Sequence, residues 1–242
     1  MLDFPVFDLV EAPSLWGFGL SFAAVAGFFA FLFTLARFLP AIKGQYGNNK
    51  SYRLTGLLSF LLVNLLVWIA WKSDYSLVWM IAHFWDLFIA ANLWAIAGSV
   101  YLYLRGLKRL GGRRGPAWDF WLGIEQNPEW AKVDLKMYFY QPSLLGMHLF
   151  VIAFAQYQWQ EYHVLNPWML TFQAFWWLYL LSHYVMEEFM LSTWDIIAER
   201  FGFMLVWGDT VYVPFLYPLC GWFLADDIWR EFGLLGWLLV AF

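Results

Sequence analysis

A carboxylate lies in the middle of one of the most apolar stretches of the chain. Asp209 falls within ERFGFMLVWGDTVYVPFLYP, residues 199–218, where most other side chains are hydrophobic or aromatic. A carboxylate in such surroundings must be protonated, hydrogen-bonded or paired with a cation. It could hold a substrate hydroxyl or relay a proton; alternatively, it belongs to a structural polar network. Gly202 and Gly208 are predicted to interrupt the helix, which a membrane tolerates where the break lines a cavity.

Other polar residues stand close to this carboxylate along the chain. Asp195 and Glu199 are one helical turn apart if their segment is helical. Tyr212 and Tyr217 follow Asp209 within the same apolar run. We therefore expect these side chains to line a common pocket or a buried polar network.

Histidines supply a second set of chemically capable side chains. His83 and Asp86 are three residues apart, so they share one face of a helix. An ionisable pair inside a membrane indicates a functional site, although a satisfied polar pair between helices is equally consistent. Together with His148 and His183, His83 could also provide axial ligands for haem or chlorophyll, although no ligand spacing connects them. The single Cys220 excludes a cysteine metal cage, and no metal site is predicted.

The composition defines the environment in which these residues act. Of the 242 residues, 62% are hydrophobic and only 13% are charged, whereas soluble domains carry about 25% charged residues. The chain is therefore predicted to be a multi-pass integral membrane protein with the lipid bilayer as its main partner. It is rich in Trp, with 18 residues, and its net charge of −4 argues against nucleic-acid binding.

The apolar runs predict an all-α, polytopic transmembrane helical bundle that forms a single membrane domain over residues 1–242. About 20 apolar residues cross the hydrocarbon core as a helix. About six full spans are expected, followed by a C-terminal half-span in the final FGLLGWLLVAF. The predicted spans cover residues 16–39, 54–72, 77–104, 143–160, 166–186 and 203–224.

Basic residues gather in the loops 40–53 and 105–142 and at their edges, which predicts the orientation of the chain. Positively charged loops face the cytoplasm. Both loops are therefore predicted to be cytoplasmic, and the N-terminus is predicted to lie on the non-cytoplasmic side. The basic residues concerned are Arg37, Lys43, Lys50, Arg53, Arg105, Lys108, Arg109, Arg113, Arg114, Lys132 and Lys136.

Four segments, taken in order, resemble the signatures of one known family. They are LPAIKGQYGNNKSYRLTGLLSF, DFWLGIEQNPEWAKVDLKMYFYQPSLLGM, EEFMLSTWDIIAERFGFMLVWGDTVYVPFLYPL and CGWFLADD, and they cover most of residues 38–225. They resemble the sterol reductase family, which includes the C14 and C7 sterol reductases and the membrane domain of the lamin B receptor. The third segment is the longest and most specific match.

This resemblance implies an NADPH-dependent reductase that adds a proton and then a hydride to a ring carbon–carbon double bond. It implies that the matched polar residues belong to a substrate pocket or to the signature loop. The matched pocket residues are Glu187, Asp195, Asp209, Tyr212 and Tyr217, and those of the loop are Glu125, Asn127, Asp134 and Lys136.

The chain departs from the family pattern at several positions, most notably where the family has arginine. Thr55 replaces an Asn, Gln126 a Leu, Ser143 a Gly, and three arginines are lost. A lost arginine removes a rigid set of hydrogen-bond donors. The residues at the arginine positions are Ile124, Glu129 and Gln141.

The resemblance also implies that the family's cofactor-binding half would follow Phe242, so NADPH binding is expected only if that half is supplied. The first interpretation is therefore a truncated or repurposed reductase-like subunit of a membrane assembly, with other membrane subunits as partners. The first alternative is part of an active sterol or isoprenoid reductase completed by further residues or a second chain. The second alternative is a lipid- or pigment-binding membrane protein.

Overall fold

The computed structural model describes residues 5–46, 50–228, 233 and 236. Most of this part of the chain is helical, as predicted, although two short antiparallel hairpins interrupt the all-α pattern. Four helical segments are long and apolar enough to cross a membrane: Leu15–Phe38, Phe84–Leu110, Leu135–Tyr162 and Phe203–Asp226. The predicted C-terminal half-span falls almost entirely outside the described residues.

The first half of the chain forms helices around one hairpin, whose strands pair from Ile42 with Leu54 to Tyr46 with Lys50. Its elements are α1 (Pro5–Asp8), α2 (Leu15–Phe38), β1 (Ile42–Tyr46), β2 (Lys50–Leu54), α3 (Gly56–Lys72), α4 (Trp79–Ala82), α5 (Phe84–Leu110) and α6 (Pro116–Leu122).

The second half begins with a two-residue hairpin and continues as long and short helices. Its elements are β3 (Glu129–Trp130), β4 (Val133–Asp134), α7 (Leu135–Tyr162), α8 (Pro167–Val185), η1 (Glu187–Ser192), α9 (Trp194–Ile197), α10 (Phe203–Trp207), η2 (Gly208–Tyr212), α11 (Val213–Leu216), η3 (Tyr217–Leu219) and α12 (Cys220–Asp226).

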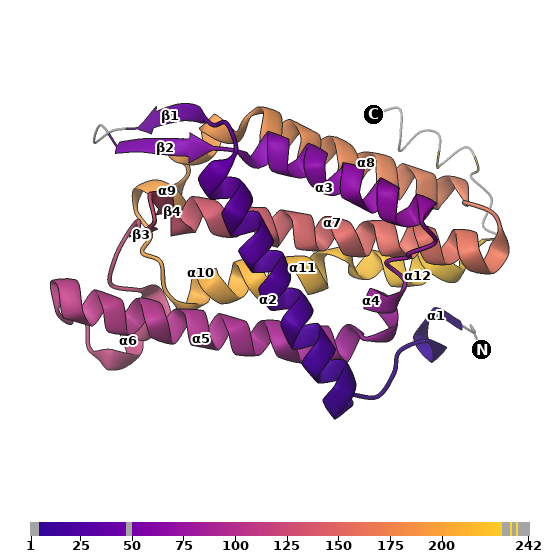
Figure 1. Cartoon of the computed structure of the whole chain (residues 1–242), viewed down its shortest axis with the longest axis horizontal. Coiled ribbons are helices and arrows are strands. Elements are labelled where there is room, and N and C mark those ends of the chain that lie inside the picture. The colour runs from indigo at the N-terminus through magenta and orange to yellow at the C-terminus, as the bar shows by residue number, and fades with distance from the viewer. Residues whose placement is uncertain (1–4, 47–49, 229–232, 234–235, 237–242) are drawn as a thin grey trace.

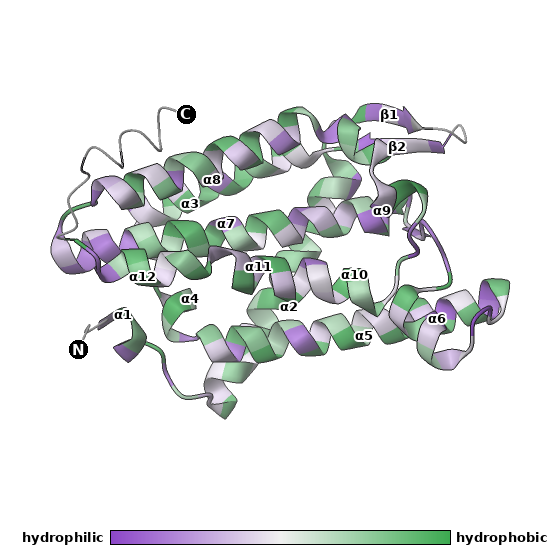
Figure 2. Ribbon diagram, turned by 180° about the vertical axis from the view of Figure 1, so that it is seen from behind, coloured by the Kyte–Doolittle hydropathy of each residue, from purple (hydrophilic) through white to green (hydrophobic). Residues whose placement is uncertain are grey.

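The long helices run side by side, with α2 crossing them obliquely (Figure 1). The hairpin β1–β2, helix α6 and helix α9 lie at the end of the bundle opposite the N-terminus. Hydrophobic residues dominate the helices, and hydrophilic residues gather towards the two ends (Figure 2). The loops 40–53 and 105–142 therefore share one end of the bundle.

The helices differ from the predicted boundaries of two spans. The span expected at 77–104 is divided at His83, where the backbone turns away from helical geometry (φ −96°, ψ 30°), and α5 then continues to Leu110. The span expected at 143–160 begins eight residues earlier, because Asp134 caps α7 through the Met137 amide and Pro142 is accommodated inside the helix. The loop predicted over 105–142 is consequently helical at both ends and over α6.

The count of about six full spans is not confirmed, because two of the predicted six do not meet the length and hydropathy that a span needs. Helix α3 has only 17 residues. Helix α8 has 19 residues but is not among the four candidates, since polar residues such as Gln173 and Ser182 lower its hydropathy.

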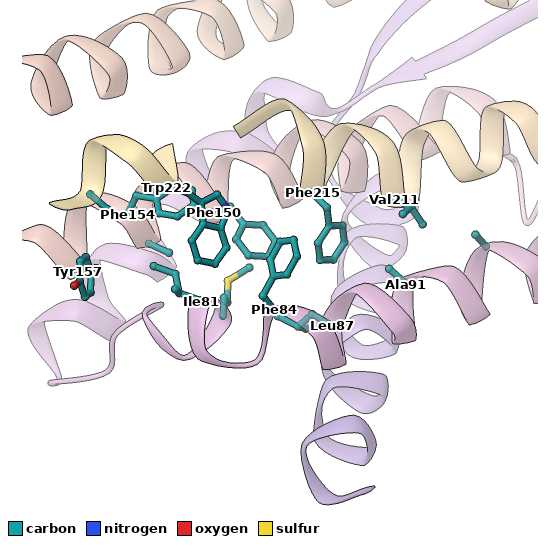
Figure 3. Packing of buried hydrophobic residues seen from close by; sticks show 14 of the residues in the cluster. Ile81, Phe84, Leu87, Ala91, Phe150, Phe154, Tyr157, Val211, Phe215 and Trp222 are labelled. Carbon is teal, nitrogen blue, oxygen red and sulfur yellow. The ribbon is translucent and has the colours of Figure 1, made fainter. Parts of the chain in front are cut away.

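Aromatic rings form the centre of the core between α4, α5, α7 and α12 (Figure 3). The Phe84 ring meets the Phe215 ring edge to face at 5.6 Å and the Trp222 ring at 5.3 Å. Phe154 of α7 packs against Trp222 from the other side at 5.3 Å. Edge-to-face contacts of this kind are favourable beyond the burial of apolar area, so they fix α7 against the last helical segment.

The segment that carries Asp209 is a continuous helix with one wide turn. Gly202 precedes it in an extended conformation (φ −122°, ψ −167°), so the predicted break at this glycine is confirmed. The predicted break at Gly208 is wrong, because its backbone is helical (φ −53°, ψ −50°). Instead, residues 208–212 form a turn of π-helix. Such turns insert an extra residue without losing the backbone hydrogen bonds, and they occur frequently at functional sites.

Candidate functional site

One face of α7 presents a row of polar side chains to the interior. Lys136, Tyr140 and Ser143 are four and three residues apart, so they project from the same side of the helix. This row faces α9 and the π-turn η2. The helix starts where it does because the Asp134 side chain accepts the Met137 amide at 3.0 Å.

Lys136 joins α7 to the end of α9. Its side chain is 1% exposed, and its Nζ donates to the backbone carbonyls of Asp195 at 2.5 Å and Glu199 at 2.6 Å. Helix α9 ends at Ile197, so Glu199 is not one turn beyond Asp195 in a helix, as the sequence had suggested. The Glu199 carboxylate instead accepts the Trp194 indole N–H at 3.0 Å and leaves only its carbonyl in the cluster.

Asp209 and Asp195 belong to the same buried cluster. The Tyr140 hydroxyl donates to Asp195 Oδ2 at 2.5 Å. Asp209 is 9% exposed, its carboxylate is hydrogen-bonded by the Ser143 side chain, and Asp195 and Lys136 lie within electrostatic range. These contacts bring Asp195 and Asp209 together in one polar cluster, and α7 supplies its other side.

The two predicted tyrosines lie elsewhere on this helical segment. Tyr212 and Tyr217 are 44% and 49% exposed, and their rings meet edge to face at 5.5 Å. Two residues that sequence reasoning did not propose as site residues, Tyr140 and Ser143, take their place beside the carboxylates. The four- and three-residue spacing from Lys136 could have identified both, had residues 135–142 been predicted as helix.

An apolar cavity of about 190 Å³ lies near this cluster and is lined by chain neighbours of two of its residues. Phe28 of α2, Leu87 of α5, Gly146 of α7 and Thr210 of η2 are among the residues that line it, and none of the lining residues is charged. Thr210 adjoins Asp209 in the chain, and Pro142, which also lines the cavity, adjoins Ser143. Asp209 and Ser143 do not line the cavity themselves, so the buried carboxyl lies one residue along the chain from the wall of a space suited to an uncharged, apolar group.

The signature loop forms a second polar layer next to the cluster. Lys50 Nζ lies 2.5 Å from Asp134 Oδ2 and 3.1 Å from Glu129 Oε1. Burial acts to lower the pKa of Lys50, but the two carboxylates outweigh it and raise that pKa. Asn127 donates to the Tyr52 hydroxyl at 3.2 Å and to the Ile196 carbonyl at 3.1 Å. These bonds tie the hairpin β1–β2 to α9.

Glu125 also belongs to this layer and is separate from the Asp209 cluster. Its carboxylate lies 3.3 Å from the guanidinium groups of both Arg105 and Arg109. Its carbonyl accepts the Phe201 amide at 2.9 Å. Glu125 therefore connects the end of α5 to the residues that lead into α10.

Glu187 caps a helix that is remote in sequence. Its Oε2 accepts the Gly56 amide at 2.9 Å, at the N-terminus of α3, where the helix dipole favours negative charge. The side chain is buried, and this burial raises the pKa of Glu187 to about 7, although the Gly56 hydrogen bond opposes the shift.

Stability is therefore expected to depend on pH through Glu187. The folded-state pKa of about 7 lies above the ordinary value of 4.5, so folding favours the protonated carboxyl. The free energy of unfolding is expected to fall by on the order of 3 kcal/mol as the pH rises from about 4.5 to about 7. Thermal unfolding of the purified protein at pH 5 and pH 8 should show this loss, and Glu187→Gln should reduce it. The neighbouring exposed Glu188→Gln is the matched control, and an unchanged pH dependence in Glu187→Gln would contradict the assignment.

The predicted His83–Asp86 pair is present but works at a helix start. His83 Nδ1 lies 3.4 Å from Asp86 Oδ2 and 3.6 Å from Glu11 Oε2. The other oxygen of Asp86 accepts the Ser14 amide at 3.2 Å, at the beginning of α2. Because the chain turns at His83, the pair does not share the face of one helix, and the structural interpretation of this pair fits the contacts.

The histidines proposed as haem or chlorophyll ligands lie on different elements. His148 of α7 directs Nε2 at Asn64 Oδ1, 3.0 Å away, while its Nδ1 is buried. His183 of α8 stacks edge to face with Tyr184. Among the described residues, no group of three or more His, Cys, Asp or Glu side chains could hold a metal ion.

The fold and the cluster define a class: a multi-span helical membrane protein with a buried carboxyl near an apolar cavity. Comparison with known proteins specifies this class further. The profile of the ergosterol biosynthesis ERG4/ERG24 family matches residues 5–240, and the chain belongs to this family.

Individual relatives point in the same direction. The chain is 32% identical to a Delta(14)-sterol reductase of Arabidopsis thaliana over 83% of its own length and 58% of that relative's. It is 32% identical to the Delta(14)-sterol reductase LBR of Gallus gallus over 93% of its length and 37% of the relative's. It is 31% identical to a Delta(14)-sterol reductase of Methylotuvimicrobium alcaliphilum, over 74% and 44% respectively. The chain thus spans about half the length of the curated relatives it matches.

Proposed function

We propose that this chain forms the substrate-binding and proton-donating part of a sterol-type double-bond reductase. The observation that carries the proposal is the buried Asp209 carboxyl, hydrogen-bonded by Ser143 and one residue along the chain from Thr210, which lines an apolar cavity. The relatives support the proposal, because they are named as Delta(14)-sterol reductases.

In this proposal the apolar lining binds an uncharged ring system and excludes water from it. The Asp209 carboxyl holds the proton that is donated to one carbon of the double bond, leaving a cation on the other carbon. A carboxylate that forms beside this cation stabilises it, because charges interact strongly in a dry site. Tyr140 and Lys136 fix Asp195 and the end of α9, so they position the wall that faces Asp209.

The resemblance implies that NADPH supplies the hydride, but the residues near Asp209 do not fit a dinucleotide. The cavity lining contains no cation that could bind a phosphate. Lys136 donates to two carbonyls, Lys50 pairs with Asp134, and Arg105 and Arg109 both pair with Glu125. No step of hydride transfer is therefore assigned to the described residues.

A second candidate function is a repurposed, non-catalytic subunit of a membrane assembly. The observation that favours it is that neutral residues occupy two buried positions where the resemblance implies arginine. Gln141 is buried and donates to Thr55 Oγ1 at 2.9 Å. Ile124 is also buried and packs where a Cβ on Gly106 would lie. These positions are adapted to neutral side chains.

For the membrane arrangement we keep six crossings as part of the proposal, with α3 and α8 as the two shorter ones. A helix of about 17 residues is at the lower limit for crossing the hydrocarbon core. The end of the bundle that carries β1–β2 and α6 would face the cytoplasm because it is basic, and the N-terminus would face the other side.

Substitution of Asp209 tests the first proposal. Asp209→Asn is expected to keep folding, because an amide can still bond Ser143, while alkene reduction falls by about 100-fold through loss of the proton donor. Asp209→Leu is expected to lower the yield of folded protein as well. Reduction of a Δ14 sterol with NADPH, in membranes that contain the whole protein, is followed by mass spectrometry, with the exposed Asp74→Asn as the matched control.

The outcome also separates the two functions. Full activity of Asp209→Asn would exclude the proton-donor role. If the wild-type protein itself neither binds NADPH nor reduces the sterol, the non-catalytic subunit is favoured; detectable binding or reduction by the purified 242-residue chain would exclude it.

A further inference from the structure

A second pocket lies at the N-terminal end of α3, away from the Asp209 cavity. It measures about 410 Å³ and lies between the end of α2, the hairpin β1–β2, α3 and the junction of α8 with η1. Ile42, Leu54 and Leu58 contribute apolar walls, and Tyr184 and Glu187 contribute polar groups. The two pockets share no lining residue.

Tyr184 brings a buried hydroxyl without a partner to this pocket. Its side chain is 3% exposed, and its hydroxyl makes no hydrogen bond with any described residue. A buried hydroxyl that loses water without gaining a partner costs about 1–3 kcal/mol. Such an orphan group in a native structure indicates a missing partner, which here can enter through the pocket that Tyr184 lines.

Glu187 supplies a complementary acceptor nearby. Its Oε2 accepts the Gly56 amide, whereas no hydrogen bond to its Oε1 is formed by the described residues. The two groups lie close together at Gly56, where an added Cβ would contact both the Tyr184 ring and the Glu187 carboxylate. Glu187 is also within electrostatic range of Tyr184.

We propose that this pocket binds the hydroxyl end of a neutral membrane lipid. A hydroxyl oxygen accepts the Tyr184 O–H, and the hydroxyl proton is donated to Glu187 Oε1. The hydrocarbon part lies against Leu54 and Leu58 and extends into the bilayer. A lipid with an ether in place of the hydroxyl cannot donate a hydrogen bond to Glu187. A fatty acid would place its carboxylate beside the Glu187 carboxylate, and the two negative charges repel each other once Glu187 is ionised.

The location supports a lipid rather than a water-soluble ligand. The lining residues come from the hairpin β1–β2, the start of α3 and the end of α8. These elements meet at the end of the bundle that carries the hairpin (Figure 1), where hydrophilic residues gather (Figure 2). Leu58 is 41% exposed on α3, so the apolar wall continues onto a surface that faces the bilayer. The polar groups thus lie at headgroup depth and the apolar wall lies below them.

The experiment is photo-crosslinking of the whole protein in lipid nanodiscs with a diazirine-bearing long-chain alcohol. Labelled peptides are mapped by mass spectrometry, and oleyl alcohol, cholesterol, oleyl methyl ether and oleic acid are compared as competitors at pH 8. Label is expected on the peptides of β2, α3 and η1, with competition by one or both alcohols at least about tenfold stronger than by the ether or the acid. The more effective alcohol identifies an acyl-chain alcohol or a sterol as the source.

Two variants make the result decisive. Tyr184→Phe removes only the hydroxyl and is expected to weaken the alcohol about tenfold without lowering thermal stability, because the orphan group is gone. Tyr179→Phe on the same helix lies outside the pocket and is the matched control. Leu58→Trp fills the pocket and should abolish the label. Equal competition by the ether, or wild-type affinity in Tyr184→Phe, would overturn the proposal; neither readout depends on reductase activity.

Discussion

Gly202→Ala is expected to destabilise the protein by about 3 kcal/mol or more, because the new methyl group would strike the backbone of Leu122 and Gly123. A Cβ on Gly202 would fall well inside contact distance of the Gly123 amide nitrogen, 2.5 Å from the Leu122 carbonyl carbon and 2.7 Å from the Gly123 Cα. Backbone atoms cannot rotate away as a flexible side chain can. The clash would therefore separate the end of α6 from the start of α10.

The control lies six residues further along the same helical segment. A Cβ on Gly208 would meet nothing within 4 Å, and the backbone there is already helical. Gly208→Ala is therefore expected to be neutral or to stabilise by about 0.5–1 kcal/mol. Thermal unfolding in detergent and the fraction of monodisperse protein measure both variants. If the two glycines respond alike, the close approach of Gly202 to Gly123 does not hold the fold together.

Gly123 lies where two signature segments that are far apart in sequence pack against each other. Its φ of +87° favours glycine, and a Cβ there would meet the Phe201 carbonyl and the Gly202 nitrogen. Next to this crossing, the Phe201 amide donates to the Glu125 carbonyl at 2.9 Å. Both segments resemble the family signatures, but the sequence alone does not show that Gly123 and Gly202 approach each other closely in the fold.

The burial of Asp209 and its polar surroundings were predictable, because a lone carboxylate in an apolar run must find partners. Its actual partners were not predictable. The sequence QPS at 141–143 suggests a loop, since proline disfavours helix. The capped and densely packed α7 overrides that preference, and this places Ser143 and Tyr140 opposite η2.

The same limitation explains the misjudged carboxylates. Glu199 looked like a pocket residue from its spacing to Asp195, yet α9 ends before it and only its carbonyl faces inward. His83 and Asp86 were expected to share one helix face, as a functional site or a structural polar pair, yet a break at His83 leaves Asp86 to cap α2. In each case tertiary contacts determine where a helix begins or ends. The position of that helix end then determines which atoms reach the interior.

Lys136→Met is expected to be the most damaging single change in the polar cluster. Methionine fills a similar volume but cannot donate, so the carbonyls of Asp195 and Glu199 would lose their charged donor inside the protein. Two buried acceptors left without a partner cost about 1–3 kcal/mol each. Asp195 and Asp209 would also lose a cation that lies within electrostatic range of both. The end of α9 should then detach from α7, with loss of folded protein.

A matched control separates this role from a general effect of charge. Lys132 stands four residues earlier, in the exposed turn between β3 and β4, and Lys132→Met removes the same charge without removing any internal bond. Lys132→Met is expected to unfold within about 0.5 kcal/mol of the wild type. Lys136→Arg keeps the charge, but the planar guanidinium group does not reproduce a compact ammonium donor between two carbonyls. Lys136→Arg is therefore expected to recover only part of the stability that Lys136→Met loses. Lys136→Met could instead show the same thermal unfolding as Lys132→Met. The carbonyls of Asp195 and Glu199 would then have to be hydrogen-bonded by water. The cluster around Asp209 would therefore contain water, whereas proton donation to a double bond requires a site from which water is excluded.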